Sequence, residues 1–149
     1  MGTHFKGSKE EVETLDAFIK LMRATETMNN RLNRSLAEND LTVSQFGTLE
    51  VLLHLGPLNQ STIGKKLLKS GGNITMVIDN LEKNGLVERK RDPEDRRSVQ
   101  VCLTGRGESF IREYFPEHLA RIREQFAVLT PEERRSLARI CKKLGTGDV

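Results

Sequence analysis

The sequence predicts a mainly α-helical chain with a small antiparallel sheet, an α+β fold in which helices dominate. Apolar residues recur at spacings of three and four through residues 9–38 and again through residues 104–145, as they do in amphipathic helices. Between these segments, apolar and polar side chains alternate through residues 86–103 around a turn, which is typical of a β-hairpin. Two shorter helical patterns precede the hairpin.

The 149 residues amount to one domain, and their net charge of +3 is by itself weak evidence for a nucleic-acid partner. The charge is unevenly placed, however. Residues 61–106 contain ten Lys or Arg and six Asp or Glu, which leaves +4 in this segment and −1 in the remainder. Phosphate binding requires such a local basic excess.

Several protein classes find no support in the sequence. No apolar run approaches the length of a membrane span, and the first residues lack the apolar middle of a signal peptide, so we expect a cytoplasmic protein. The two cysteines and three scattered histidines give no disulfide framework and no zinc-ligand spacing. Neither a glycine-rich phosphate loop nor a nucleophile with a recognisable base is present, so we expect no enzyme and no cofactor.

The first long helix is followed by a shorter, more apolar one. Thr42 and Gln45 have the spacing of a capping box, which predicts that a helix begins there and ends near Gly56-Pro57. Residues 57–59 are expected to add a short third strand to the sheet, with Asn59 capping the next helix.

Two short helices lie between Asn59 and the hairpin. The second, predicted from Asn73, has Ile74 and Ile78 on an apolar stripe, and Asn84-Gly85 is expected to end it. Its remaining surface carries short polar side chains, which suit the reading of base edges in a major groove. An ordinary solvated helix face would have the same composition.

The hairpin loop is expected to project three charged residues, Asp95, Arg96 and Arg97, away from the core. Asp92-Pro93 suits the first two positions of a type I turn, and a proline cannot continue a strand ladder. An exposed arginine on a narrow loop can enter a minor groove, where its guanidinium meets concentrated negative potential. We expect Asp95 to orient Arg97 through a charge-assisted hydrogen bond.

These residues resemble the MarR family of bacterial transcriptional regulators, whose winged helix-turn-helix carries a wing of the form D-x-R followed shortly by L-T. Here the two motifs are Asp95-Arg96-Arg97 and Leu103-Thr104-Gly105-Arg106-Gly107. The run IDNLEKNGLVER, residues 78–89, also looks like the family's exit from its recognition helix into the first wing strand.

The resemblance covers nearly the whole chain and implies a single domain, residues 1–149. Within it, residues 42–115 would form the winged-helix DNA-binding lobe, flanked by dimerisation helices at residues 9–38 and 116–145. Two lobes related by a two-fold axis match a pseudo-palindromic duplex with half-site centres about 34 to 36 Å apart.

The carboxy-terminal region is predicted to contain two helices. Thr104 can cap the first, which Pro116 should kink or briefly break. Thr130-Pro131-Glu132-Glu133 begins the second in the manner of a capping box with proline at the first helical position, and Gly145 is expected to end it.

We therefore expect a sequence-specific, homodimeric repressor that binds double-stranded DNA. Many MarR-like sequences carry arginine where this chain has Met76, so contact with a thymine methyl group or shape readout would carry more of the specificity. Lysines on the first short helix and on the wing would position the phosphate backbone. The expected DNA-binding residues are Ser61, Thr62, Lys65, Lys66, Lys69, Asn73, Thr75, Met76, Asn80, Lys90, Arg91, Asp95, Arg96 and Arg97.

The resemblance further implies release by a small aromatic or phenolic ligand in a cleft between the lobe and the dimerisation helices. Its candidate contacts are Phe18, Met22, His54 and Phe110, although core packing would explain each of them too. Two other functions stay open. Cys102 could make the chain a thiol-based redox sensor, with Cys141 buried and inert, or the winged helix could bind only proteins.

Overall fold

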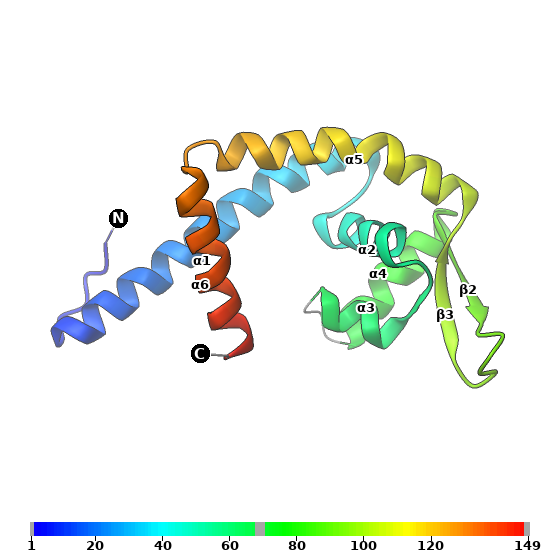
Figure 1. Ribbon diagram of the computed structural model, residues 1–149, viewed down its shortest axis with the longest axis horizontal. Helices are drawn as coiled ribbons and strands as arrows, with labels where there is room; N and C mark the ends of the chain where they lie inside the picture. Colours follow the sequence, from blue (N-terminus) through cyan, green and yellow to red (C-terminus); the bar gives the residue numbers. More distant parts are fainter. Residues whose placement is uncertain (1, 68–70, 148–149) are drawn as a thin grey trace. The chain divides into compact units, whose positions relative to one another are not determined.

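The computed structural model describes residues 2–67 and 71–147. The predicted fold class is confirmed, because the described chain is mainly helical and has one small antiparallel sheet (Figure 1). In chain order the elements are α1 (Lys9–Leu36), the short 3₁₀-helix η1 (Ala37–Asn39), α2 (Val43–Leu55), β1 (Leu58–Asn59), α3 (Gln60–Lys66), α4 (Gly71–Lys83), β2 (Val87–Arg91), β3 (Val99–Leu103), α5 (Gly105–Phe126) and α6 (Pro131–Thr146).

The chain consists of two compact units that divide between Phe115 and Pro116. The first unit contains α1 to α4, the sheet and the first half of α5, and the second contains the rest of α5 and α6. Pro116 was expected to kink or briefly break its helix. Helix α5 is continuous through Pro116, so the break does not occur.

Side-chain caps fix where α2 and α3 begin. The backbone N–H of Gln45 donates to Thr42 Oγ1 over 3.2 Å, and the N–H of Thr42 donates to Gln45 Oε1 over 3.0 Å. This reciprocal pair is the predicted capping box. Gly56, with φ of 76°, ends α2, and Asn59 Oδ1 accepts from the N–H of Thr62 over 2.8 Å at the start of α3. Each of these predicted boundaries is confirmed.

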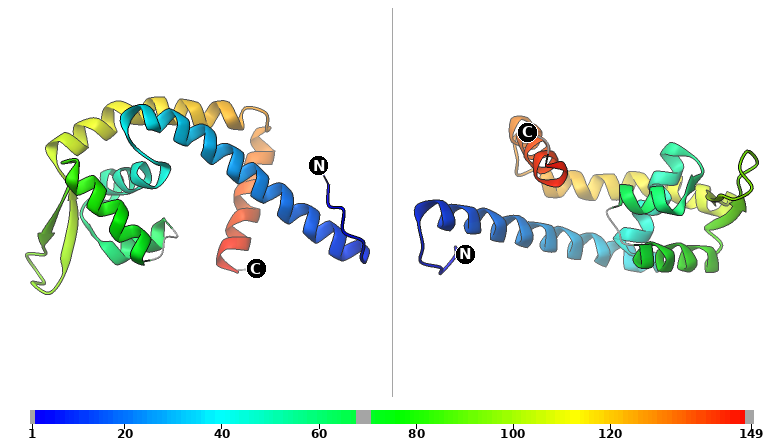
Figure 2. Two further views of the ribbon diagram at one scale, coloured as in Figure 1. Left: turned by 180° about the vertical axis from the view of Figure 1, so that it is seen from behind. Right: turned by 90° about the horizontal axis from the view of Figure 1, so that it is seen from below.

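The sheet has the strand order β1-β3-β2, and both strand pairs are antiparallel. In the hairpin Val87 lies opposite Leu103 and Arg89 lies opposite Val101, while β1 supplies the expected third strand by placing Leu58 opposite Val101. The loop of the β2–β3 hairpin extends well beyond α4 in Figure 1 and in both views of Figure 2.

One hydrophobic core holds the first unit together, formed by the end of α1, by α2, α3 and α4, by the sheet and by the first half of α5. Burial of each large aliphatic side chain stabilises the fold by about 1.5 to 3 kcal/mol, so these elements keep fixed positions relative to one another. The most deeply buried side chains are those of Leu36, Phe46, Leu49, Ile63, Ile74, Ile78, Leu81, Val87, Val101 and Ile111.

Two sequence expectations about α6 were wrong. The helix continues through Gly145 to Thr146, and Gly147 caps it with φ of 69°. A glycine inside a helix costs only about 1 kcal/mol, whereas the left-handed cap conformation strongly favours glycine, so the second glycine ends the helix. Cys141 was expected to be buried but is exposed in the single chain, because its apolar face of α6 is uncovered there.

Candidate nucleic-acid interface

Helix α4 has one face in the core and its remaining surface in solvent. Ile74, Ile78 and Leu81 are buried, as their helical spacing predicted. The helix begins at Gly71, two residues before the expected start. The four residues expected to face bases are exposed on it, namely Asn73, Thr75, Met76 and Asn80. Met76 is 64% exposed, so its thioether is accessible to a partner.

Helix α3 presents a short basic edge. Its buried Ile63 anchors it to the core, while Lys65 and Lys66 lie exposed in its last turn. Of the two hydroxyl residues at its start, Ser61 is exposed and Thr62 is half-buried. The remaining expected contact of this segment, Lys69, lies outside the described residues.

The first wing strand ends in two exposed basic residues, Lys90 and Arg91. Lys90 Nζ lies 2.9 Å from a carboxylate oxygen of Glu88, and this hydrogen bond raises the pKa of Lys90. The ammonium group therefore stays fully charged at neutral pH, as a phosphate contact requires.

The wing loop is ordered by its own short hydrogen bonds. The N–H of Asp92 donates to the Ser98 carbonyl, and the N–H of Ser98 donates to the Asp95 carbonyl, both over 2.9 Å. Asp95 Oδ1 accepts the N–H of Arg97 over 3.0 Å. The expected bond from Asp95 to the Arg97 guanidinium is thus replaced by one to its main chain, which fixes the backbone from which the exposed Arg97 side chain projects.

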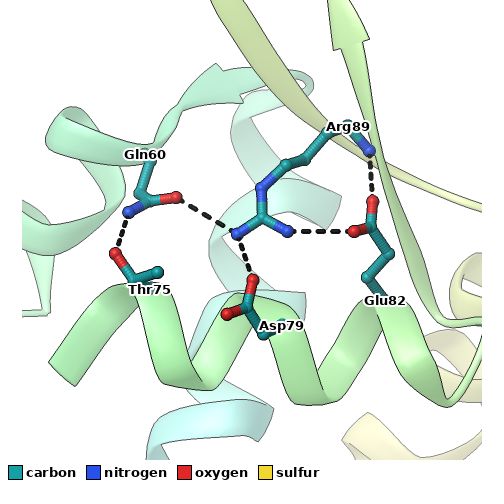
Figure 3. A network of polar contacts seen from close by, with 5 residues as sticks. All are labelled: Gln60, Thr75, Asp79, Glu82 and Arg89. Carbon is teal, nitrogen blue, oxygen red and sulfur yellow. Dashed lines mark hydrogen bonds and ion pairs between the residues drawn. The ribbon is translucent and has the colours of Figure 1, made fainter. Parts of the chain in front are cut away.

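One feature of the interface was missed in the sequence. Arg89 on β2 contacts two carboxylates of α4, with Nη2 2.7 Å from Asp79 and Nη1 2.9 Å from Glu82. Its Nη2 also donates to Gln60 Oε1 over 3.4 Å, and Gln60 Nε2 in turn donates to Thr75 Oγ1 (Figure 3). The network joins the wing, the start of α3 and the exposed surface of α4.

A signal for this network exists in the sequence. Strand alternation puts Arg89 on the same face as the core residue Val87, where a charge needs partners. Asp79 and Glu82 are three apart on the preceding helix and therefore share one of its faces. Gln60 has no comparable signal, because its contact depends on how α3 crosses α4.

The four candidate ligand contacts lie on three helices, α1, α2 and α5. The ring of His54, which is exposed, meets Phe115 edge-on at 5.6 Å, and half-buried Phe110 stacks on Tyr114 at 5.8 Å. Phe18 and Met22, on α1, are 56% and 45% exposed.

A cavity of about 620 Å³ lies elsewhere, in the second unit, and none of these four residues lines it. Its walls include Ile122, Arg123, Phe126 and Arg134.

Other site types find little support in the part of the chain that the structure describes. Within it, no group of three or more His, Cys, Asp or Glu side chains could hold a metal ion. None of its helices is both long enough and apolar enough to cross a membrane. Cys102 is half-buried on β3, where it pairs with Glu88 across the hairpin.

Three helices packed on a β1-β3-β2 sheet, with an exposed polar face on the third and a basic hairpin beside it, define a winged helix-turn-helix protein. Residues 41–99 match the model of the MarR family. The HTH-type transcriptional regulator YkoM of Bacillus subtilis is 36% identical over 93% of this chain and 90% of its own length. The HTH-type transcriptional regulator MhqR of the same organism is 35% identical over 89% and 92%.

Solved structures show the same architecture. A mutant of Escherichia coli MarR complexed with operator DNA superimposes with a TM-score of 0.79 at 26% identity, covering 89% of this chain and 95% of that one. Bordetella bronchiseptica BpsR, whose DNA binding is regulated by 6-hydroxynicotinic acid, gives a TM-score of 0.80 at 24% identity over 99% and 100% of the two chains.

The chain belongs to the MarR family of DNA-binding transcriptional regulators. Its relatives are regulators of transcription and not enzymes.

Proposed function

We propose that the chain is a homodimeric repressor that binds a pseudo-palindromic operator through two copies of α4 and of the wing. The observation that carries this proposal is the exposed polar surface of α4, held in place by a fully buried stripe on the same helix and accompanied by an ordered basic wing. A rigid helix of this kind can present side chains to base edges in a defined register.

Specificity would come from the exposed side chains of α4. Amides such as those of Asn73 and Asn80 can pair with adenine in the major groove, and the hydroxyl of Thr75 can bond to several bases. The exposed thioether of Met76 suits the methyl group of thymine. A thymine or a deformable step is therefore expected opposite Met76, in place of the guanine that an arginine would select.

Affinity would come from contacts to phosphates and to the minor groove. Lys65 and Lys66 at the end of α3 and the pair Lys90 and Arg91 at the end of β2 would lie along the DNA backbone, helped by the hydroxyl groups of Ser61 and Thr62. Arg97 would enter the minor groove from the loop fixed by Asp95, with Arg96 beside it.

In this proposal residues 42–115 bind DNA and residues 9–38 and 116–145 form the dimer, and the apolar side chains that the single chain leaves exposed support the second part. Large apolar side chains are exposed on α1, α5 and α6, where a second copy of the chain would cover them. They are those of Phe18, Met22, Leu119, Ile140 and Leu144.

Release of the operator would follow binding of a small aromatic or phenolic molecule near Phe18, Met22, His54 and Phe110. BpsR offers a precedent for an aromatic acid that controls DNA binding in this fold. Such a ligand shifts the dimer away from DNA only by binding the released state more tightly than the bound state.

The test is selection of binding sites from a random duplex pool with the purified full-length chain at two salt concentrations. A palindromic motif that survives the higher salt supports a sequence-specific regulator. Motif-free binding that disappears with salt would contradict it and leave the basic surface as a non-specific one. The selected duplex then serves as the probe for ligands that displace the protein.

A further inference from the structure

The guanidinium of Arg89 occupies a site that matches its fork of donors. Nη1 is 2.9 Å from Glu82 and Nη2 is 2.7 Å from Asp79, two carboxylates on successive turns of α4. The backbone N–H of Arg89 donates to the second oxygen of Glu82 over 3.0 Å, so one carboxylate holds both ends of the residue. The side chain is only 25% exposed, which separates this arrangement from an ordinary surface ion pair.

Arg89 also determines which way the Gln60 amide faces. A guanidinium has donors and no acceptor, so Gln60 must turn its carbonyl oxygen toward Nη2. Its amide nitrogen then faces Thr75, whose Oγ1 accepts the bond, as Figure 3 shows. An arginine on the wing thereby fixes a hydrogen bond to a hydroxyl on the exposed surface of α4.

We propose that Arg89 and Gln60 are positioning residues for DNA recognition, acting through Thr75 and without contacting the duplex themselves. This inference rests on the proposed function, in which Thr75 faces a base. The relay holds the Thr75 side chain in one orientation and neutralises Asp79, a carboxylate on the same helix that would otherwise repel the DNA backbone. Specificity at the base pair opposite Thr75 depends on all three residues.

The geometry argues against Arg89 as a direct phosphate contact. Its guanidinium already contacts three side chains of the protein, those of Asp79, Glu82 and Gln60. The two carboxylates more than balance its single positive charge. By contrast, Lys90 on the same strand is paired with one carboxylate and is 61% exposed. The two neighbours are therefore expected to behave differently when each is replaced.

The experiment compares the full-length wild type with Arg89→Lys, Gln60→Leu and Thr75→Val. Arg89→Lys keeps the charge but removes the fork, Gln60→Leu leaves both ion pairs of Arg89 in place, and Thr75→Val removes only the hydroxyl. Affinities are measured for the selected operator, for operators with single base pairs replaced, and for a random duplex over a series of salt concentrations. Arg112→Lys, at an exposed arginine on α5 paired with Glu108, is the matched control.

We expect all three variants to lose discrimination at the same base pair, by about five- to tenfold, with unchanged affinity for the random duplex and an unchanged salt slope. The double variant Gln60→Leu/Thr75→Val should discriminate no worse than Thr75→Val alone, because Gln60 acts through that hydroxyl. Arg112→Lys should match the wild type. If Arg89→Lys proves poorly folded in thermal unfolding, the Gln60→Leu series carries the test.

Two results would overturn the inference. A uniform loss of affinity for every duplex in Arg89→Lys, with a shallower salt slope, would make Arg89 a phosphate contact. Additive losses in the double variant would show that Gln60 does not act through Thr75. Failure of the proposed function looks different, because the wild type would then select no motif, and this inference would fall with it.

Discussion

At the scale of single residues, Arg97 is the side chain with the most direct expected role in binding. Its backbone is fixed by the bond to Asp95 while its side chain is exposed at the wing tip. Replacement by alanine should cost about 1 to 3 kcal/mol of operator binding, because it removes the attraction between the guanidinium and a narrow, strongly negative minor groove. Fluorescence anisotropy at fixed salt measures this. Arg139→Ala, on α6, is the control, and an unchanged affinity in Arg97→Ala would refute the wing contact.

Gly107 is required by a close approach between the start of α5 and the turn after α4. A Cβ at this position would lie 1.9 Å from the Leu86 carbonyl oxygen, which already accepts the N–H of Thr104 over 3.1 Å. Backbone must therefore move to admit any side chain.

Gly107→Ala should lower the free energy of unfolding by about 1 to 3 kcal/mol or more, since overpacking here displaces main chain. Urea denaturation measures the loss. Gly105→Ala is a matched control two residues away in the same helical turn, where an added Cβ meets nothing within 4 Å. Equal stability of the two variants would contradict the close approach.

His118 predicts a pH dependence of stability. Burial, followed by the nearby charge of Arg121, lowers the pKa of His118 from its ordinary value of 6.5. Below pH 6.5 the unfolded chain therefore binds a proton that the folded chain resists, so this contribution to stability is present above 6.5 and is lost as pH falls. His118→Gln should show a flatter decline in the free energy of unfolding between about pH 7 and pH 5.5. An identical decline in both proteins would contradict the shift.

At the scale of elements, α3 and α4 are expected to contribute different kinds of contact. Lys66 is exposed at the end of α3 and carries the chemistry of a phosphate contact. Lys66→Gln should weaken binding to operator and random duplex alike and reduce the slope of log affinity against log salt by about 1. A loss confined to the operator would contradict this role.

The helices and strands themselves could be predicted because each has a local chemical cause. The reciprocal bonds of Thr42 and Gln45, the left-handed Gly85 after α4 and the alternation of β2 all depend on neighbours in sequence. The local pattern did not determine the end of α6, because either Gly145 or Gly147 could cap the helix. In the structure Gly147 is the cap.

The side-chain partners across the interface could not be predicted in the same way. Gln60 and Thr75 are fifteen residues apart, and Gln60 and Arg89 are twenty-nine apart, so their contacts depend on the packing of three elements. The sequence therefore indicated which residues α4 exposes, whereas the contact of Arg89 with Gln60, and through it with Thr75, was not predicted. Asp95 was expected to bond to the guanidinium of Arg97, but it accepts the main-chain N–H of Arg97 instead. A separation of two residues favours the main-chain group.

At the scale of the whole molecule, the proposed recognition of a palindrome requires two chains. Leu144 is 67% exposed in the single chain. It lies on the apolar side of α6, which a second copy of the chain would cover. Leu144→Glu should therefore shift the protein from dimer to monomer, as measured by sedimentation, and lower operator affinity. Arg139→Glu puts the same carboxylate on the opposite side of α6 and should leave the dimer intact. Dissociation in both variants, or in neither, would contradict the assigned face.

The most direct test of a dimer that binds both half-sites is to insert about five base pairs between the half-sites of the selected palindrome and to measure the affinity. The insertion places the two half-sites on opposite sides of the duplex. We expect affinity to fall to near that for a single half-site. An insertion of a full turn, about ten base pairs, should also lower the affinity, because it widens the spacing of the half-sites. Undiminished affinity for the half-turn insertion would show that each chain reads its half-site alone and would contradict the account.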